Sequence, residues 1–305
     1  PPGTGKTSVA LKRMVEGHLQ KEHDILLLAY TNRAVDEICA MLSTIEPQPQ
    51  YIRIGREFSC APDYRDNLLV NTLGKLSNRL EVIEKVKDTH IFVGTVASMN
   101  SHLALFKLKH FQVAIFDEAS QILEPHLLPI LTSSSIDKIV MIGDHKQLPA
   151  VVVQDESKSV VASPMLHAIG LTNCRNSLFE RLYEQFRHRK DIVAMLGHQG
   201  RMHPVIADFV SRLFYENRLL PVGLPHQNET LLFAKYDEND PTELLVATRR
   251  CAFVHVPSPS FEDYMPKANV LEAQMIAQIV KKICSVHQKN GISFDPSKQL
   301  GIIVP

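Results

Sequence analysis

The chain has 305 residues, more than one compact domain usually holds, which predicts two domains. Its composition, 45% hydrophobic and 22% charged, matches that of globular proteins and excludes a disordered or fibrous chain. The formal net charge is zero, which excludes a global attraction to polyanions, so any nucleic-acid binding must come from local geometry.

Short apolar runs alternate with helical patterns through the first half of the chain. Helices are predicted at Ser8–Gln20 and Ala34–Ser43, and strands at Asp24–Tyr30, His90–Gly94, Gln112–Phe116 and Lys138–Gly143. Each predicted strand is hydrophobic nearly throughout, as expected when helices cover both faces of a parallel sheet. The alternation predicts an α/β fold with a doubly wound parallel sheet.

Prolines and charges interrupt this pattern between residues 46 and 88, which we interpret as an insertion that ends in a charged helix, Leu80–Asp88. A charged segment near residue 190 marks a domain boundary, so we expect a first domain at 1–190 and a second at 191–305. The second domain is predicted to contain helices at Val205–Leu213 and Val270–Val286, an irregular stretch at Pro221–Glu243, and strands at Ala252–Val256 and Leu300–Val304.

Residues 1–7 read PPGTGKT, a P-loop that lacks only its first glycine. Gly3 and Gly5 let the backbone curl so that successive N–H groups point at phosphate oxygens, at the positive end of the following helix. Lys6 would reach the β- and γ-phosphates, and the Thr7 hydroxyl would bind Mg²⁺. The sequence therefore predicts a nucleotide site made by Pro2, Gly3, Thr4, Gly5, Lys6 and Thr7.

Two carboxylates, Asp117 and Glu118, follow the predicted strand at 112–116, at the edge where open parallel sheets bind ligands. Asp117 would hold Mg²⁺, and Glu118 would accept the proton of the water that attacks the γ-phosphorus. Gln147 follows the next predicted strand and would hydrogen-bond a γ-phosphate, so that it registers whether ATP or ADP is bound.

Five segments together resemble the motifs of superfamily 1 helicases, in the order in which those helicases carry them. They are PPGTGKT, YTNRAVDEI from Tyr30, DEASQ from Asp117, GDHKQLPAV from Gly143 and QGRMHPVIADFVSRLFYENRL from Gln199. The chain looks most like the 5′-to-3′ branch, which includes the nonsense-mediated-decay RNA helicase and the Okazaki-fragment helicase–nuclease. The closing segment LGIIVP, Leu300–Pro305, is similar to a strand of that branch.

The resemblance implies a RecA-like P-loop NTPase domain followed by part of a second RecA-like domain, in a chain cut at both ends. It implies that Arg201 reaches the γ-phosphate from the second domain. Thr31, Asn32 and Thr95 would grip the phosphodiester backbone of a single strand without reading bases. The alternative for Thr31 and Asn32 is that they cap the helix beginning at Ala34, and the two roles are compatible.

The sequence departs from the family at Gly200, where relatives commonly carry a tyrosine that packs on adenine, so stacking from that side is not expected. The chain also stops before the family's later motifs, which include an arginine finger. Without that arginine, transition-state charge lacks a partner, a loss of roughly 10³-fold or more in comparable enzymes.

No apolar stretch approaches the roughly 20 residues of a membrane span, and no secretory signal is visible. The 5 cysteines lack a Cys-x-x-Cys spacing, so neither a zinc site nor an iron–sulfur cluster is predicted. We expect an intracellular protein, cytoplasmic or nuclear, with no membrane partner.

We predict an ATP- and Mg²⁺-dependent motor core, a monomer that hydrolyses ATP and moves 5′ to 3′ along single-stranded DNA or RNA. The predicted catalytic residues are Lys6, Glu118, Gln147 and Arg201. Two alternatives stay open. In the first, the polypeptide as an isolated fragment is a nucleotide- and strand-binding module with little turnover. In the second, it is another P-loop NTPase, such as an AAA+ or kinase-like protein.

Overall fold

The computed structural model describes residues 1–230, 233–257 and 268–304. The chain divides into two compact units, Pro1–Gln199 and Gly200–Pro305. The first unit ends after Gln199, later than the boundary expected at residue 190. Among the described residues, no helix has both the length and the apolar character needed to cross a membrane.

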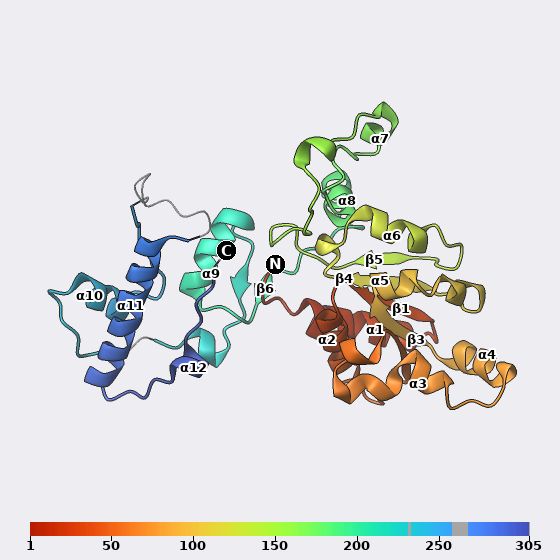
Figure 1. The fold of residues 1–305 in the computed structure, drawn as a ribbon, viewed down its shortest axis with the longest axis horizontal. Helices are drawn as coiled ribbons and strands as arrows, with labels where there is room; N and C mark the ends of the chain where they lie inside the picture. Colours follow the sequence, from red (N-terminus) through yellow and green to blue (C-terminus); the bar gives the residue numbers. More distant parts are fainter. Residues whose placement is uncertain (231–232, 258–267, 305) are drawn as a thin grey trace. The chain divides into compact units, whose positions relative to one another are not determined.

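A parallel sheet of five strands forms the centre of the first unit, in the order β2-β3-β1-β4-β5 (Figure 1). The strands are β1 (Ile25–Ala29), β2 (Tyr51–Ile54), β3 (Ile91–Thr95), β4 (Val113–Asp117) and β5 (Ile139–Met141). Every residue of the first four is buried, because helices lie on both sides of the sheet. The expected α/β fold with a doubly wound parallel sheet is confirmed.

The helices of the first unit follow the chain between these strands. The α-helices are α1 (Lys12–Leu19), α2 (Asn32–Leu42), α3 (Leu69–Leu73), α4 (Arg79–Asp88), α5 (Val96–Asn100), α6 (Glu124–Leu131), α7 (Pro164–Ala168) and α8 (Leu178–Phe186). Other helical segments and a final strand are η1 (Lys6–Leu11), η2 (Glu57–Ser59), η3 (Pro62–Asn67), η4 (Leu103–Lys107), η5 (Ala119–Gln121), η6 (Glu156–Lys158) and β6 (His198–Gln199). Helix η1 runs directly into α1, so the P-loop lysine begins a continuous helical segment.

Successive side chains of β1 point to opposite faces of the sheet and so enter two separate hydrophobic cores. Ile25, Leu27 and Ala29 belong to the core that includes buried side chains of α1 and α2. Leu26 and Leu28 belong to the core that includes buried side chains of α5 and α6. The central strand is thus fixed from both sides, which holds its carboxyl end in place.

The insertion expected at 46–88 needs correction, because this segment supplies edge strand β2, which pairs with β3. The strand is difficult to recognise in the sequence, because Arg53 interrupts the apolar run of its four residues and a buried arginine is rare. Arg53 is only 1% exposed, and its guanidinium donates to the Asp36 carboxylate of α2. This ion pair compensates the buried charge and ties α2 to the sheet edge.

The second unit contains helices α9 (Pro204–Phe214), α10 (Pro241–Thr248), α11 (Val270–Lys289) and α12 (Pro296–Gln299), together with η7 (Pro225–Gln227) and β7 (Leu220–Pro221). Helices α9 and α11 occur where the sequence predicts helices. Glu243 of α10 is 2% exposed and joins α10 to α11, accepting hydrogen bonds from Ser285 Oγ at 3.1 Å and Lys289 Nζ at 2.5 Å.

The two strands predicted in this unit, 252–256 and 300–304, are wrong, because both segments are irregular in the structure. Phe253 is 92% exposed and Ile303 is 97% exposed, so these apolar runs are not buried between helices as the prediction assumed. A strand also requires a neighbour that accepts its backbone hydrogen bonds, which a short apolar run does not guarantee. Pro305, the last residue of the LGIIVP segment, lies outside the described residues.

Candidate nucleotide site

The predicted P-loop forms a tight turn ahead of η1. Gly3 and Gly5 have φ values of 68° and 71°, in the left-handed region that favours glycine. The Gly5 carbonyl accepts hydrogen bonds from the main-chain nitrogens of Val9 and Ala10, at 2.9 and 3.0 Å. A Cβ added at Gly5 would lie 2.9 Å from Val9 Cγ2, so the turn has no room for a side chain. Helix η1 begins directly after this turn, and the first amides of a helix have no carbonyl partner within it, which is what phosphate binding requires.

The acidic pair meets the P-loop although 110 residues separate Thr7 from Asp117. Thr7 Oγ1 donates a hydrogen bond of 2.7 Å to Asp117 Oδ2. Lys6 Nζ lies 3.6 Å from Glu118 Oε1. The structure therefore brings together the four side chains predicted to bind phosphate, hold a metal ion and activate water.

Burial governs the electrostatics of both carboxylates. The pKa of Asp117, which is 2% exposed, is raised by desolvation, although hydrogen bonds from Thr7 and from the Glu118 N–H act in the opposite direction. The pKa of Glu118 is also raised mainly by desolvation, while the nearby Lys6 ammonium lowers it. The site thus concentrates negative charge in a place where water compensates it poorly, which favours a bound cation.

Thr7 and Asp117 fit the chemistry of a magnesium site. Mg²⁺ prefers hard oxygen ligands and is usually bound by one or two carboxylates together with water and substrate phosphates. A hydroxyl oxygen and a carboxylate oxygen 2.7 Å apart, beside a phosphate-binding turn, supply such ligands. Among the described residues, no group of three or more His, Cys, Asp and Glu side chains forms a different metal site.

The segment carrying Gln147 packs directly against the residues that follow the acidic pair. Ala119 N donates to Ile142 O at 2.8 Å, and Asp144 N donates to Ser120 Oγ at 3.1 Å. Gln147 itself is exposed, and its Nε2 donates to Asp144 Oδ2 at 2.6 Å. Sequence reasoning assigned no role to Asp144, although its place three residues before Gln147 was a signal that the two side chains meet.

The predicted strand-binding residues lie at the carboxyl edge of the sheet. Thr95 and Asp117 end β3 and β4, and both align with Ala29 of β1, just before Thr31. Thr31 Oγ1 accepts from Ala34 N at 3.1 Å, and Asn32 is the exposed first residue of α2. The capping role is therefore present at Thr31, and strand contact stays a prediction.

The Thr95 hydroxyl is engaged within the protein. It donates to Ser98 Oγ at 2.8 Å and accepts from Ser98 N at 3.0 Å, and the residue is 6% exposed. These contacts cap α5. The Thr95 hydroxyl thus already donates and accepts a hydrogen bond within the protein, and neither contact involves a nucleic-acid strand.

Arg201 and Gly200 belong to the second unit. Arg201 is exposed and lies just before α9, and its predicted contact with a γ-phosphate stays a prediction. A Cβ at Gly200 would lie 3.0 Å from Leu224 Cδ1. The space that a larger side chain would enter is therefore partly filled by Leu224.

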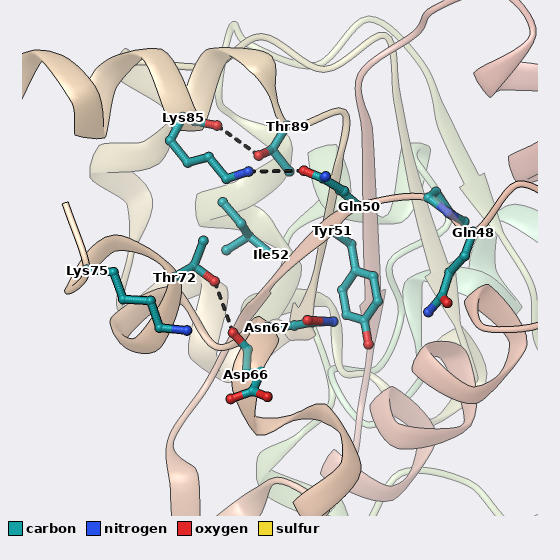
Figure 2. A pocket seen from close by; sticks show the side chains of 11 residues that line it. Gln48, Gln50, Tyr51, Ile52, Asp66, Asn67, Thr72, Lys75, Lys85 and Thr89 are labelled. Atoms are coloured by element: carbon teal, nitrogen blue, oxygen red, sulfur yellow. Dashed lines mark hydrogen bonds between the residues drawn. The ribbon is translucent and has the colours of Figure 1, made fainter.

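A cavity of about 440 Å³ lies apart from this site, beside Tyr51 and Ile52 of edge strand β2 (Figure 2). Its rim includes Lys85, whose Nζ donates to Gln50 Oε1 at 3.1 Å, and Thr89, which donates to the Lys85 carbonyl at 2.8 Å. None of the residues predicted for nucleotide or strand binding lines it. The candidate site therefore rests on side-chain geometry at the P-loop.

Comparisons with known proteins agree with this geometry. A family model described as an AAA domain matches residues 1–79 and 71–155, and a second model with the same description matches residues 174–305. The DNA replication ATP-dependent helicase/nuclease JHS1 of Arabidopsis thaliana is 30% identical over 310 residues, which cover 100% of this chain and 21% of that protein.

The Xenopus laevis protein named DNA replication ATP-dependent helicase/nuclease DNA2 is 28% identical and covers 100% of this chain and 28% of its own length. An uncharacterized ATP-dependent helicase of Methanocaldococcus jannaschii, MJ0104, is 27% identical over 70% of this chain and 29% of that protein. The chain thus spans about a quarter of the length of these relatives. With AAA-domain models over most of its residues and helicase relatives along its whole length, the chain belongs to the superfamily 1 helicases.

Proposed function

We propose that this chain is the ATP-hydrolysing motor core of a helicase that moves along single-stranded nucleic acid. The observation that carries the proposal is the meeting of the P-loop with the acidic pair, through the 2.7 Å Thr7–Asp117 hydrogen bond and the 3.6 Å Lys6–Glu118 approach. These are the groups that phosphoryl transfer to water needs in one place.

In the proposed reaction, the P-loop amides and Lys6 bind the phosphates of ATP and hold the γ-phosphate in position for attack. Thr7 and Asp117 would hold Mg²⁺, which neutralises phosphate charge when bound. Glu118 would orient the attacking water and take its proton, and the 31% exposure of its side chain supports this role because water is able to reach the carboxylate.

Gln147 is proposed to contact the γ-phosphate, and Arg201 of the second unit to contribute a further positive charge to it. The second unit, matched by an AAA-domain model, is proposed to be a second RecA-like domain. Cycles of ATP binding and hydrolysis would then alter the grip of the two domains on the strand.

A single strand is proposed to cross the carboxyl edge of the sheet at Thr31 and Asn32, with travel from 5′ to 3′. The amide N–H groups at the start of α2 suit phosphate oxygens, so capping and strand binding can share this helix end. The JHS1 and DNA2 relatives are named as DNA replication helicase/nucleases, which favours DNA as the strand.

Steady-state ATP hydrolysis by the full-length protein, with and without single-stranded DNA, tests the proposal. We expect Lys6→Ala to lose ATP binding and turnover. Glu118→Gln should retain ATP binding while turnover falls by roughly 10²- to 10⁴-fold, because only proton transfer is removed. Lys21→Ala and Glu84→Gln, at exposed positions, are the matched controls. If the rate of ATP turnover is the same with and without single-stranded DNA, and the same in the wild type and in Glu118→Gln, the motor assignment is refuted.

A further inference from the structure

Asp144 is a buried carboxylate that the proposed reaction does not use. Asp144 is 5% exposed and lies in the loop that follows β5, shortly after the strand ends at Met141. Its Oδ1 accepts from Lys146 N at 3.1 Å, and its own N–H donates to Ser120 Oγ at 3.1 Å. The main chain of Asp144 and one oxygen of its carboxylate are therefore both hydrogen-bonded within the protein.

The remaining oxygen of this carboxylate holds the predicted γ-phosphate sensor. Asp144 Oδ2 accepts from Gln147 Nε2 at 2.6 Å, and Gln147 N donates to the Asp144 carbonyl at 3.1 Å. A hydrogen bond from an amide to an ionised carboxylate is charge-assisted and stronger than one between neutral groups. The Gln147 amide is thus hydrogen-bonded to an anionic group of the protein itself.

Asp144 also lies close to the phosphate-binding loop. Its Oδ2 is 3.5 Å from the main-chain nitrogen of Pro1. A γ-phosphate that approaches the same amide would face this carboxylate at short range, where repulsion between two anions is strong because little water screens it.

We propose that Asp144 is a positioning residue that competes with the γ-phosphate for the amide of Gln147. The proposal rests on the assignment of Gln147 as the γ-phosphate sensor. In the proposed competition, the contact between Gln147 and Asp144 that the structure shows forms whenever no γ-phosphate competes for the amide. ATP takes the amide away from the carboxylate, and loss of the γ-phosphate returns it, so part of the binding free energy of ATP is used to switch Gln147.

Affinities for ADP and for a non-hydrolysable ATP analogue, measured on the full-length protein, test this competition. Asp144→Asn removes the charge and weakens the hold on Gln147, so we expect analogue affinity to rise roughly tenfold. ADP affinity should stay the same, because ADP has no γ-phosphate. Asp137→Asn, whose side chain is 51% exposed, controls for loss of one negative charge.

The background of Gln147→Ala separates competition from a structural effect. There, Asp144→Asn should no longer raise the analogue-to-ADP affinity ratio, because the contested amide is gone. If Asp144→Asn does not fold, Asp144→Ser serves instead, since its short hydroxyl is able to accept from Lys146 N but not to reach Gln147.

Each result decides the matter. An unchanged or lower affinity ratio in Asp144→Asn overturns the competition, and a lower ratio would mean that Asp144 orients Gln147 for the phosphate. If Gln147→Ala alone leaves the ratio unchanged, Gln147 is not the sensor and the inference fails with that assignment. The motor function is tested separately, through Lys6 and Glu118.

Discussion

Replacing Gly5 with alanine is expected to damage nucleotide binding specifically. Gly5 has φ +71°, and an alanine held in that left-handed conformation costs about 1–2 kcal/mol. The new Cβ would also lie 2.9 Å from Val9 Cγ2 and 3.2 Å from Val9 Cβ, so Val9 or the turn must move. The two effects together amount to roughly 2–3 kcal/mol of distortion in a loop whose backbone amides must point at phosphates.

Because the turn is local, we expect it to relax rather than to unfold the domain, and the loss to appear in binding. A cost of about 2–3 kcal/mol corresponds to a dissociation constant for ATP that is roughly 30- to 150-fold larger. Titration of a fluorescent ATP analogue measures this loss, and thermal unfolding without nucleotide should change by only a few degrees.

Gly17 provides the matched control in the same helical segment. It lies in α1, and a Cβ there would meet nothing within 4 Å. Gly17→Ala should therefore stabilise the helix by about 0.5–1 kcal/mol and leave nucleotide affinity unchanged. Equal affinities of Gly5→Ala and the wild type, or equal behaviour of the two variants, would refute the assignment of this turn as the phosphate cradle.

Three further predictions concern the rest of the first unit. Arg53→Leu should lower the free energy of unfolding in urea by roughly 3 kcal/mol. This loss is near the low end for a broken buried ion pair, because the Asp36 side chain is 27% exposed and is able to rehydrate. A loss below about 0.5 kcal/mol, on the order of a surface change, would contradict the role of this pair. Burial raises the pKa of Cys39 to about 11, which leaves little thiolate at pH 8. In the native protein at that pH, Cys39 should therefore resist maleimide while the exposed Cys174 reacts. Mass spectrometry identifies the labelled residue, and early labelling of Cys39 would contradict its burial. Thr31→Asp should keep the helix cap and the melting temperature, but it should weaken single-strand binding, because the new carboxylate repels phosphates. Fluorescence anisotropy at low salt measures this binding. Unchanged binding would mean that Thr31 only caps the helix.

The parts of the fold that the sequence predicts correctly are those fixed by local pattern. Apolar runs bounded by helix signals identify β1, β3, β4 and β5, and the P-loop letters identify a turn whose backbone only glycine tolerates. Edge strand β2 is missed because its burial depends on a partner distant in sequence, the Asp36 carboxylate that compensates Arg53. The opposite error occurs at 252–256 and 300–304, where an apolar run finds no place in a sheet.

The same distinction applies to the site. The approach of the P-loop to Asp117 and Glu118 is predictable, because loops at the carboxyl ends of parallel strands meet at one edge of the sheet, whereas the roles of these residues stay predictions. The engagement of Thr95 by Ser98 and of Gln147 by Asp144 depends on side-chain rotamers, which motif spacing does not specify. Such contacts decide whether a polar group is ready for a ligand or already bonded within the protein.

Glu118 adopts φ 49° and ψ 39°, a left-handed conformation that is uncommon for a residue other than glycine, asparagine or aspartate. Glycine at this position would relieve the main chain and raise thermal stability, yet it would remove the carboxylate. Screening a library of variants for heat resistance alone would therefore enrich variants that lack this carboxylate, so directed evolution of this protein requires simultaneous selection for the proposed ATP turnover.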